Sequence, residues 1–174
     1  MNKVIIITGP TGTGKTKLSI EVAKKYHTEI INGDAYQVYK NMDILTAKVT
    51  NEEKQNIPHH LFDIKEPTEE YSVAEYQQNV RNLISEFENR NLIPLIVGGS
   101  GLYLDSVIYD YDFSKVGRNN ETETKYCNLT NEELHKILES LNTEAALKIH
   151  MNNRKRVLRA IELAEDNAIV TKFN

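Results

Sequence analysis

Residues 9–16 read Gly-Pro-Thr-Gly-Thr-Gly-Lys-Thr, and this stretch decides the fold of the chain. Its spacing, Gly-x-x-x-x-Gly-Lys-Thr, is that of a P-loop, in which backbone N–H groups surround a phosphate. An apolar run at residues 4–7 precedes it and a helical pattern follows it, so the context is strand, loop and helix. The predicted phosphate-binding residues are Gly9, Pro10, Thr11, Gly12, Thr13, Gly14, Lys15 and Thr16.

Two side chains of this loop carry specific chemistry. The ammonium group of Lys15 supplies a positive charge to the outer phosphates, and the hydroxyl of Thr16 is a ligand for Mg²⁺. The glycines allow the tight turns that bring the backbone close to an anion at the start of a helix. The loop therefore predicts that a phosphate chain binds here, without saying which molecule carries it.

Strand and helix patterns alternate along the chain. Apolar runs at residues 3–8, 29–32 and 93–97 predict buried parallel strands, and residues 60–64 form a weaker candidate. Helices are expected at residues 15–25, behind capping-box sequences at Thr50, Ser72 and Thr130, and at residues 102–109, 143–149 and 154–165. This pattern predicts one P-loop domain over residues 1–174, a three-layer α/β fold with a mainly parallel sheet and a helical C-terminal part. Residues 110–128 are polar and acidic, and we expect a mobile loop there.

The composition sets limits on function. The 174 residues carry a net charge of −4, so a nucleic-acid partner would need a local basic patch. A single cysteine, Cys127, leaves no internal disulfide and fits a reducing compartment. The N-terminal apolar run is too short for a membrane span or a signal peptide, so we expect a cytoplasmic protein without a membrane partner.

Asp34 is a candidate ligand-binding residue, and with Asp63 it is one of the two candidates for an Asp that orders Mg²⁺. It follows the strand at residues 29–32, at the edge where parallel α/β sheets bind their ligands. A P-loop kinase or ATPase usually has a second apolar strand that ends in an Asp for Mg²⁺. Here the strand at residues 93–97 ends in Gly98-Gly99, and Asp63 follows only two apolar residues. These features favour a different phosphate chemistry, with an ATP-binding small-molecule or nucleotide kinase as the alternative.

Nine blocks of sequence, in this order, resemble the tRNA dimethylallyltransferases, also called tRNA isopentenyltransferases. The blocks are residues 9–16, 31–34, 37–39, 42–44, 46–48, 58–61, 71–74, 97–103 and 156–160. Only the first block is specific alone; the ordered set is highly specific. Asn41 and Leu45 stand where the family usually has glycine, and Ala35 stands where Ser is common. Family members also carry a longer helical insertion in the region of residues 110–128 and continue past the equivalent of Asn174.

The resemblance implies transfer of the dimethylallyl group from dimethylallyl diphosphate to N6 of adenosine 37, beside the tRNA anticodon, with release of pyrophosphate. It implies Mg²⁺ as cofactor and the tRNA anticodon arm as partner. Asp34, Lys15 and Ser100 are the expected catalytic residues, and the hydroxyl of Ser100 replaces that of a Thr common in the family. The expected tRNA-binding residues are Asp34, Ala35, Tyr36, Gln37, Ser100, Lys155, Arg156 and Arg159. A phosphate-binding fragment without turnover is a further alternative because the chain is short, and the oligomeric state stays open.

Overall fold

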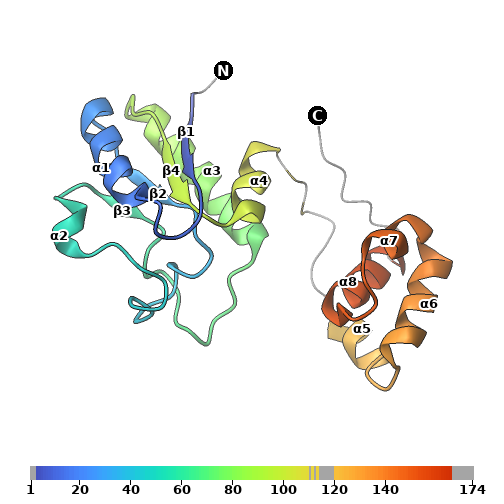
Figure 1. Ribbon diagram of the computed structural model, residues 1–174. Coiled ribbons are helices and arrows are strands. Elements are labelled where there is room, and N and C mark those ends of the chain that lie inside the picture. The colour runs from blue at the N-terminus through green and yellow to red at the C-terminus, as the bar shows by residue number, and fades with distance from the viewer. Residues whose placement is uncertain (1–2, 110, 112, 114–119, 166–174) are drawn as a thin grey trace. The chain divides into compact units, whose positions relative to one another are not determined.

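The computed structural model describes residues 3–109, 111, 113 and 120–165, and the chain divides into two compact units, Met1–Asp110 and Tyr111–Asn174 (Figure 1). The sequence predicted one domain. The difference has a physical cause, because the buried apolar side chains of the second unit form a cluster of their own. The two units are therefore described separately.

The first unit carries the sheet and its covering helices. Its elements are β1 (Ile5–Thr8), α1 (Lys15–Tyr26), β2 (Ile30–Asn32), α2 (Asn51–Lys54), β3 (His59–His60), α3 (Val73–Asn89), β4 (Leu95–Gly98) and α4 (Gly101–Ile108). The four strands are all parallel and lie in the order β1-β4-β2-β3. In the register, Ile6 and Ile31 both lie opposite Ile96. The predicted parallel α/β fold is confirmed.

The strand order decides which loops meet. Because β4 lies between β1 and β2, the carboxyl ends of these three strands are neighbours. The P-loop leaves β1, the turn at residues 33–34 leaves β2, and the turn at residues 98–101 leaves β4. All three turns therefore lie at one edge of the sheet, where α/β proteins bind ligands.

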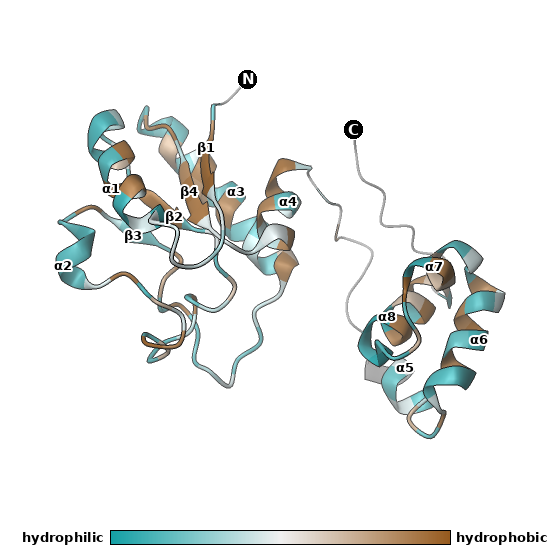
Figure 2. Ribbon diagram, in the orientation of Figure 1, coloured by the Kyte–Doolittle hydropathy of each residue, from teal (hydrophilic) through white to brown (hydrophobic). Residues whose placement is uncertain are grey.

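Side chains alternate between the two faces of the sheet, as the pleat of a strand requires. Ile30 and Leu95 pack with Ile20 and Ala23 of α1 on one face. On the other face, Ile31 and Ile96 pack against residues of α3 and α4, namely Tyr76, Val80, Phe87 and Leu104. β1 and β4 are accordingly coloured as hydrophobic segments, whereas β3, with two histidines, is hydrophilic (Figure 2). This is the expected three-layer arrangement.

Two local features differ from the sequence predictions. The candidate strand at residues 60–64 is wrong beyond His60, because Leu61 (φ 62°) and Asp63 (φ 55°) adopt left-handed backbone that ends the strand. Thr50 and Thr130 form complete capping boxes. At Ser72 only half of the box is present: the hydroxyl accepts from the Glu75 N–H, while the Glu75 carboxylate pairs with Lys65.

The second unit is helical. It contains α5 (Asn120–Lys125), α6 (Asn131–Leu141), α7 (Thr143–Lys148) and α8 (Arg154–Glu165). Helix α5 lies inside the stretch for which a loop was predicted, and residues 114–119 of that stretch lie outside the described residues. Leu134 and Leu138 of α6 pack with Val157 and Ile161 of α8 in the core of this unit.

Candidate active site

The P-loop has the backbone that its glycines permit. Gly12 (φ 82°) and Gly14 (φ 83°) both adopt left-handed conformations, which side chains with a Cβ rarely adopt. Gly14 is the N-cap of α1, so the free N–H groups of the first helical turn face the loop. Lys15 Nζ donates to the Pro10 carbonyl at 2.6 Å, and Thr13 Oγ1 donates to the same oxygen at 2.8 Å. The loop is thereby closed upon itself beside the helix N-terminus.

Close backbone contact joins the turns that follow β2 and β4. A Cβ on Gly98 would lie 2.1 Å from the carbonyl carbon and oxygen of Gly33, so only glycine fits at residue 98. Gly33 N donates to the Val97 carbonyl at 2.8 Å, and Ser100 N donates to the Gly33 carbonyl at 3.3 Å. This packing holds the turn of Asp34 against the turn of Ser100.

The backbone around Asp34 is fixed by its own neighbours. The buried Asn32 side chain accepts from Asp34 N at 2.9 Å and donates to the Asp34 carbonyl and the Leu61 carbonyl, each at 3.0 Å. Asp34 Oδ1 accepts from Tyr36 N at 2.9 Å, which forms a tight Asx turn. The Asp34 backbone is thus held by Asn32 and its carboxylate by Tyr36 N, and none of these hydrogen bonds involves the P-loop.

The Ser100 side chain contacts the backbone of this turn. Its Oγ accepts a hydrogen bond from Ala35 N at 2.9 Å, directly after Asp34 in sequence. The structure therefore brings together Asp34, Ala35 and Ser100, as expected, and gives the Ser100 hydroxyl a contact with backbone.

A pocket of about 370 Å³ joins the P-loop to the Asp34 turn. P-loop residues with Lys15 and Thr16 form one part of its lining, and Asp34, Gln37, Thr46 and Ala47 form another part. Apolar and aromatic side chains close the remainder of the pocket, namely Ile30, Val49, Phe62 and Val97, together with His59. The lining also includes Glu53, so the pocket combines donors for an anion, two carboxylate side chains and an apolar part.

Sequence reasoning missed the contribution of His59 and Phe62. The two rings meet edge to face with centroids 5.5 Å apart, and burial lowers the pKa of His59 below its usual value. His60 points to the other face of the strand, and its Nε2 lies 2.6 Å from Glu29 Oε2. His59 and Phe62 reach the pocket because β3 pairs with β2, and the sequence contains only a weak signal for the strand β3.

The expected tRNA-binding cations belong to α8 in the second unit. Lys155 and Arg156 are exposed, while Arg159 pairs with the buried Glu162 at 2.6 Å. The preceding residue, Arg154, donates to the carbonyls of Leu129, Tyr126 and Cys127 and so has a structural role. The exposed positive charge of this cluster is therefore concentrated at Lys155 and Arg156.

The donors beside the P-loop fit Mg²⁺. This ion prefers oxygen ligands and usually binds proteins through one or two of them, with phosphates and water completing the shell. The Thr16 hydroxyl and the Asp34 carboxylate line the same pocket. Among the described residues there is no cluster of three or more His, Cys, Asp and Glu side chains that would hold a metal alone.

The described helices include none that is long and apolar enough to cross a membrane.

Curated proteins of similar sequence are tRNA dimethylallyltransferases. A tRNA dimethylallyltransferase of Anoxybacillus flavithermus is 50% identical over 161 residues, which cover 92% of this chain and 52% of the relative. One of Bacillus subtilis is 48% identical over 164 residues, with the same coverage of 92% and 52%. The chain thus spans about half the length of the relatives that it matches.

Solved structures give the same answer. A full-length tRNA isopentenylpyrophosphate transferase from Bacillus halodurans matches with a TM-score of 0.65 and 41% identity, covering 95% of this chain and 56% of that one. A eukaryotic dimethylallyltransferase, crystallised acting on tRNA, matches with a TM-score of 0.84 and 30% identity, over 98% and 43% of the two chains. The family model for IPP transferase matches residues 37–172. The chain therefore belongs to the IPP transferase family, as the ordered sequence blocks indicated.

Proposed function

We propose that this chain provides the catalytic centre of a tRNA dimethylallyltransferase. The observation that carries the proposal is the pocket lined by both the P-loop and Asp34, in a chain that belongs to the IPP transferase family. In the reaction, N6 of adenosine 37 attacks the allylic carbon of dimethylallyl diphosphate. The carbon–oxygen bond breaks, pyrophosphate leaves with the electron pair, and N6 loses a proton.

The P-loop is the proposed diphosphate site. Its N–H groups at the start of α1 and the Lys15 ammonium lie where a leaving pyrophosphate needs its negative charge stabilised. Electrostatic stabilisation of this kind increases in the transition state because charge develops on the leaving group. The apolar part of the pocket, with Phe62 and Val97, offers a surface for the five-carbon chain.

Mg²⁺ is the proposed cofactor, with Thr16 as the protein ligand that would hold it. When bound, the ion supplies further positive charge to the phosphate oxygens. Lys15 and the backbone amides orient the same phosphates. Asp34, which lines the same pocket, is proposed to act on the nucleotide and not on the ion.

Asp34 is the proposed general base. An exocyclic adenine amine is a poor nucleophile because its lone pair is delocalised into the ring, and a base that takes its proton favours attack. The Asp34 turn, with Ala35, Tyr36, Gln37 and Ser100, forms the proposed contact with the substrate nucleotide; Tyr36 is 64% exposed and presents a ring for a base to stack on. Lys155, Arg156 and Arg159 are proposed to contact tRNA phosphates, which bind basic side chains.

Mass spectrometry of RNA tests the proposal. The chain is incubated with dimethylallyl diphosphate, Mg²⁺ and an anticodon stem-loop that carries adenosine at position 37. We expect the RNA mass to rise by one dimethylallyl group in place of one proton, and a stem-loop with inosine at position 37 to remain unmodified because it lacks the N6 amine. A parallel incubation with ATP in place of dimethylallyl diphosphate tests the alternative. Phosphorylated products there, with no prenylated RNA in the first incubation, would identify a kinase instead.

A further inference from the structure

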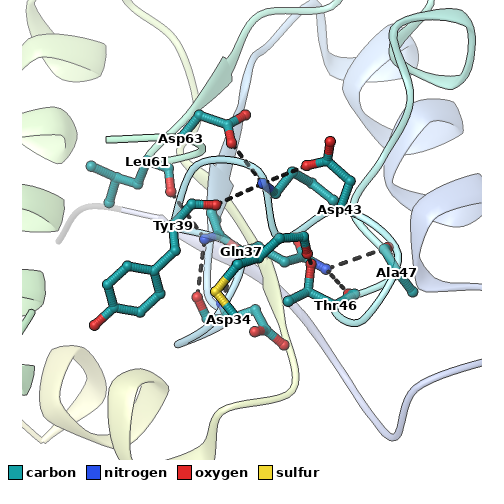
Figure 3. A network of polar contacts seen from close by, with 11 residues as sticks. Asp34, Gln37, Tyr39, Asp43, Thr46, Ala47, Leu61 and Asp63 are labelled. Carbon is teal, nitrogen blue, oxygen red and sulfur yellow. Dashed lines mark hydrogen bonds and ion pairs between the residues drawn. The ribbon is translucent and has the colours of Figure 1, made fainter. Parts of the chain in front are cut away.

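Lys48 is a buried cation next to the pocket, with no role in the chemistry proposed above. Its side chain is 4% exposed, and Nζ lies 2.7 Å from Asp43 Oδ1 and 2.6 Å from Asp63 Oδ1. Nζ also donates to the Tyr39 carbonyl at 2.8 Å, so one ammonium group has three oxygen partners, on Tyr39, Asp43 and Asp63, which Figure 3 labels. Burial alone would lower the pKa of Lys48, but the hydrogen bonds to Asp43 and Asp63 outweigh it and raise the pKa above its usual value.

These partners come from two separate segments of chain. Residues 39–48 form an irregular loop that leaves the Asp34 turn and returns to the pocket, while Asp63 follows β3. Backbone bonds join the segments only at one end, where Ile64 N donates to the Val38 carbonyl at 2.8 Å and Lys40 N donates to the Lys65 carbonyl at 2.9 Å. Lys48 joins them at the other end, where the loop returns.

The returning end of the loop forms part of the pocket wall. Thr46 and Ala47, which line the pocket, directly precede Lys48. Gln37 also lines it, and its side-chain amide donates to the Thr46 carbonyl at 2.9 Å (Figure 3). The loop has no helix or strand of its own between residues 39 and 48. Its internal backbone bonds, such as that from Lys48 N to the Asp43 carbonyl at 3.0 Å, do not reach Asp63, so the Lys48–Asp63 contact ties this wall to the segment that follows β3.

We propose that Lys48 is a positioning residue that holds the wall formed by Gln37, Thr46 and Ala47 at a fixed distance from the P-loop. It does so by tying Asp43 and Tyr39 within the loop to Asp63 outside it. The catalytic part of this inference rests on the proposed prenyl transfer, whereas its structural part concerns the order of the loop and can be measured without turnover.

Lys48→Met is the informative variant. Met keeps an unbranched chain of similar length and loses all three polar contacts. Asp43 and Asp63 are 68% and 44% exposed, so water can solvate their carboxylates once the cation is gone, and we expect the unit to fold. Lys40→Met is the matched control, because Lys40 belongs to the same loop and pairs with Glu66 at 2.6 Å, with a side chain that is 46% exposed.

Three measurements on the 174-residue chain test the proposal: hydrogen exchange, pyrophosphate titration, and kcat and KM for stem-loop prenylation. For Lys48→Met we expect faster exchange across residues 40–48 and unchanged exchange across residues 9–16. The pyrophosphate Kd should stay within about twofold, as for sites without shared partners. The kcat should fall about 10²-fold, the cost of a misplacement of roughly 1 Å in an active site. Lys40→Met should match the parent chain in all three.

Two results would overturn the proposal. Parent-like exchange across residues 40–48 in Lys48→Met would show that the loop is held without Lys48. Faster exchange that also includes β1 and β4, with loss of pyrophosphate binding, would show a general stabilising role instead of a local one. If the parent chain makes no prenylated RNA, the proposed function fails, and the exchange and pyrophosphate data still decide whether Lys48 holds the wall.

Discussion

Replacing Asp34 by Asn separates the chemical role of the carboxylate from its structural role. The backbone of Asp34 is held by the Asn32 side chain, and the contact from Tyr36 N goes to Oδ1, which Asn also possesses. The turn should therefore keep its shape in Asp34→Asn. What the variant loses is the capacity to take a proton from N6 of the adenosine.

The expected magnitude distinguishes the two roles. General-base catalysis contributes about 10²–10⁴-fold in rate, which is about 2.7–5.4 kcal/mol at about 1.36 kcal/mol per tenfold. A change in the strength of one hydrogen bond from Tyr36 N is worth about 0.5–1.5 kcal/mol, or at most about tenfold. We therefore expect kcat to fall by more than about 10²-fold.

Single-turnover prenylation of an anticodon stem-loop measures this step, and a pyrophosphate titration of the same variant measures the P-loop. The titration should be unchanged, because Asp34 and the P-loop are held by separate hydrogen bonds. Glu52→Gln on the exposed surface of α2 is the control for loss of one carboxylate. A fall in kcat of less than about tenfold would refute the general-base role, since the altered hydrogen bond explains a loss of that size.

Further predictions concern the loop, the sheet, pH and RNA. Lys15→Ala should reduce prenyl transfer by about 10²–10³-fold with an unchanged circular dichroism spectrum, and near-normal turnover would contradict the role of its charge. Gly98→Ala should destabilise the fold by about 1–3 kcal/mol in urea titrations, because its Cβ meets Gly33 backbone at 2.1 Å, whereas Gly101→Ala, with nothing within 4 Å, should not. The folded-state pKa of His59 is lowered by burial, so its contribution to stability is present above the unfolded pKa of about 6.5 and is lost as pH falls through the folded value. Stability should therefore fall below about pH 6.5 less steeply in His59→Gln than in the parent chain, and equal slopes would refute this. The chain should bind pyrophosphate about as well as a longer relative and an anticodon stem-loop more weakly at equal salt, because RNA affinity grows with the number of phosphates neutralised; equal RNA affinity would contradict this.

Local rules explain why much of the site could be predicted. The motif at residues 9–16 predicts the positive φ angles of Gly12 and Gly14 and the start of α1, because these features depend on residues that are neighbours in sequence. The Thr50 and Thr130 capping boxes are local in the same way. Asp34 could be placed at the binding edge because every parallel strand ends at the same edge of its sheet.

The order of the strands required the tertiary structure. Insertion of β4 between β1 and β2 brings Gly98 against Gly33, a contact between residues far apart in sequence that decides where Asp34 and Ser100 lie. The pocket wall also depends on distant segments: Lys48 pairs with Asp63, and His59 reaches the pocket through the pairing of β3 with β2. The division into two units has the same origin, because periodicity in the sequence marks which side chains are buried but not which of them share a core. The sequence by itself therefore determined the phosphate loop, the candidate base and the family, since each depends on local or ordered motifs. Only the tertiary structure decided how the part of the pocket that contains Gln37, Thr46, Ala47 and His59 is built and held. That part depends on contacts between segments that are far apart in sequence, and sequence separation does not say which segments meet in space.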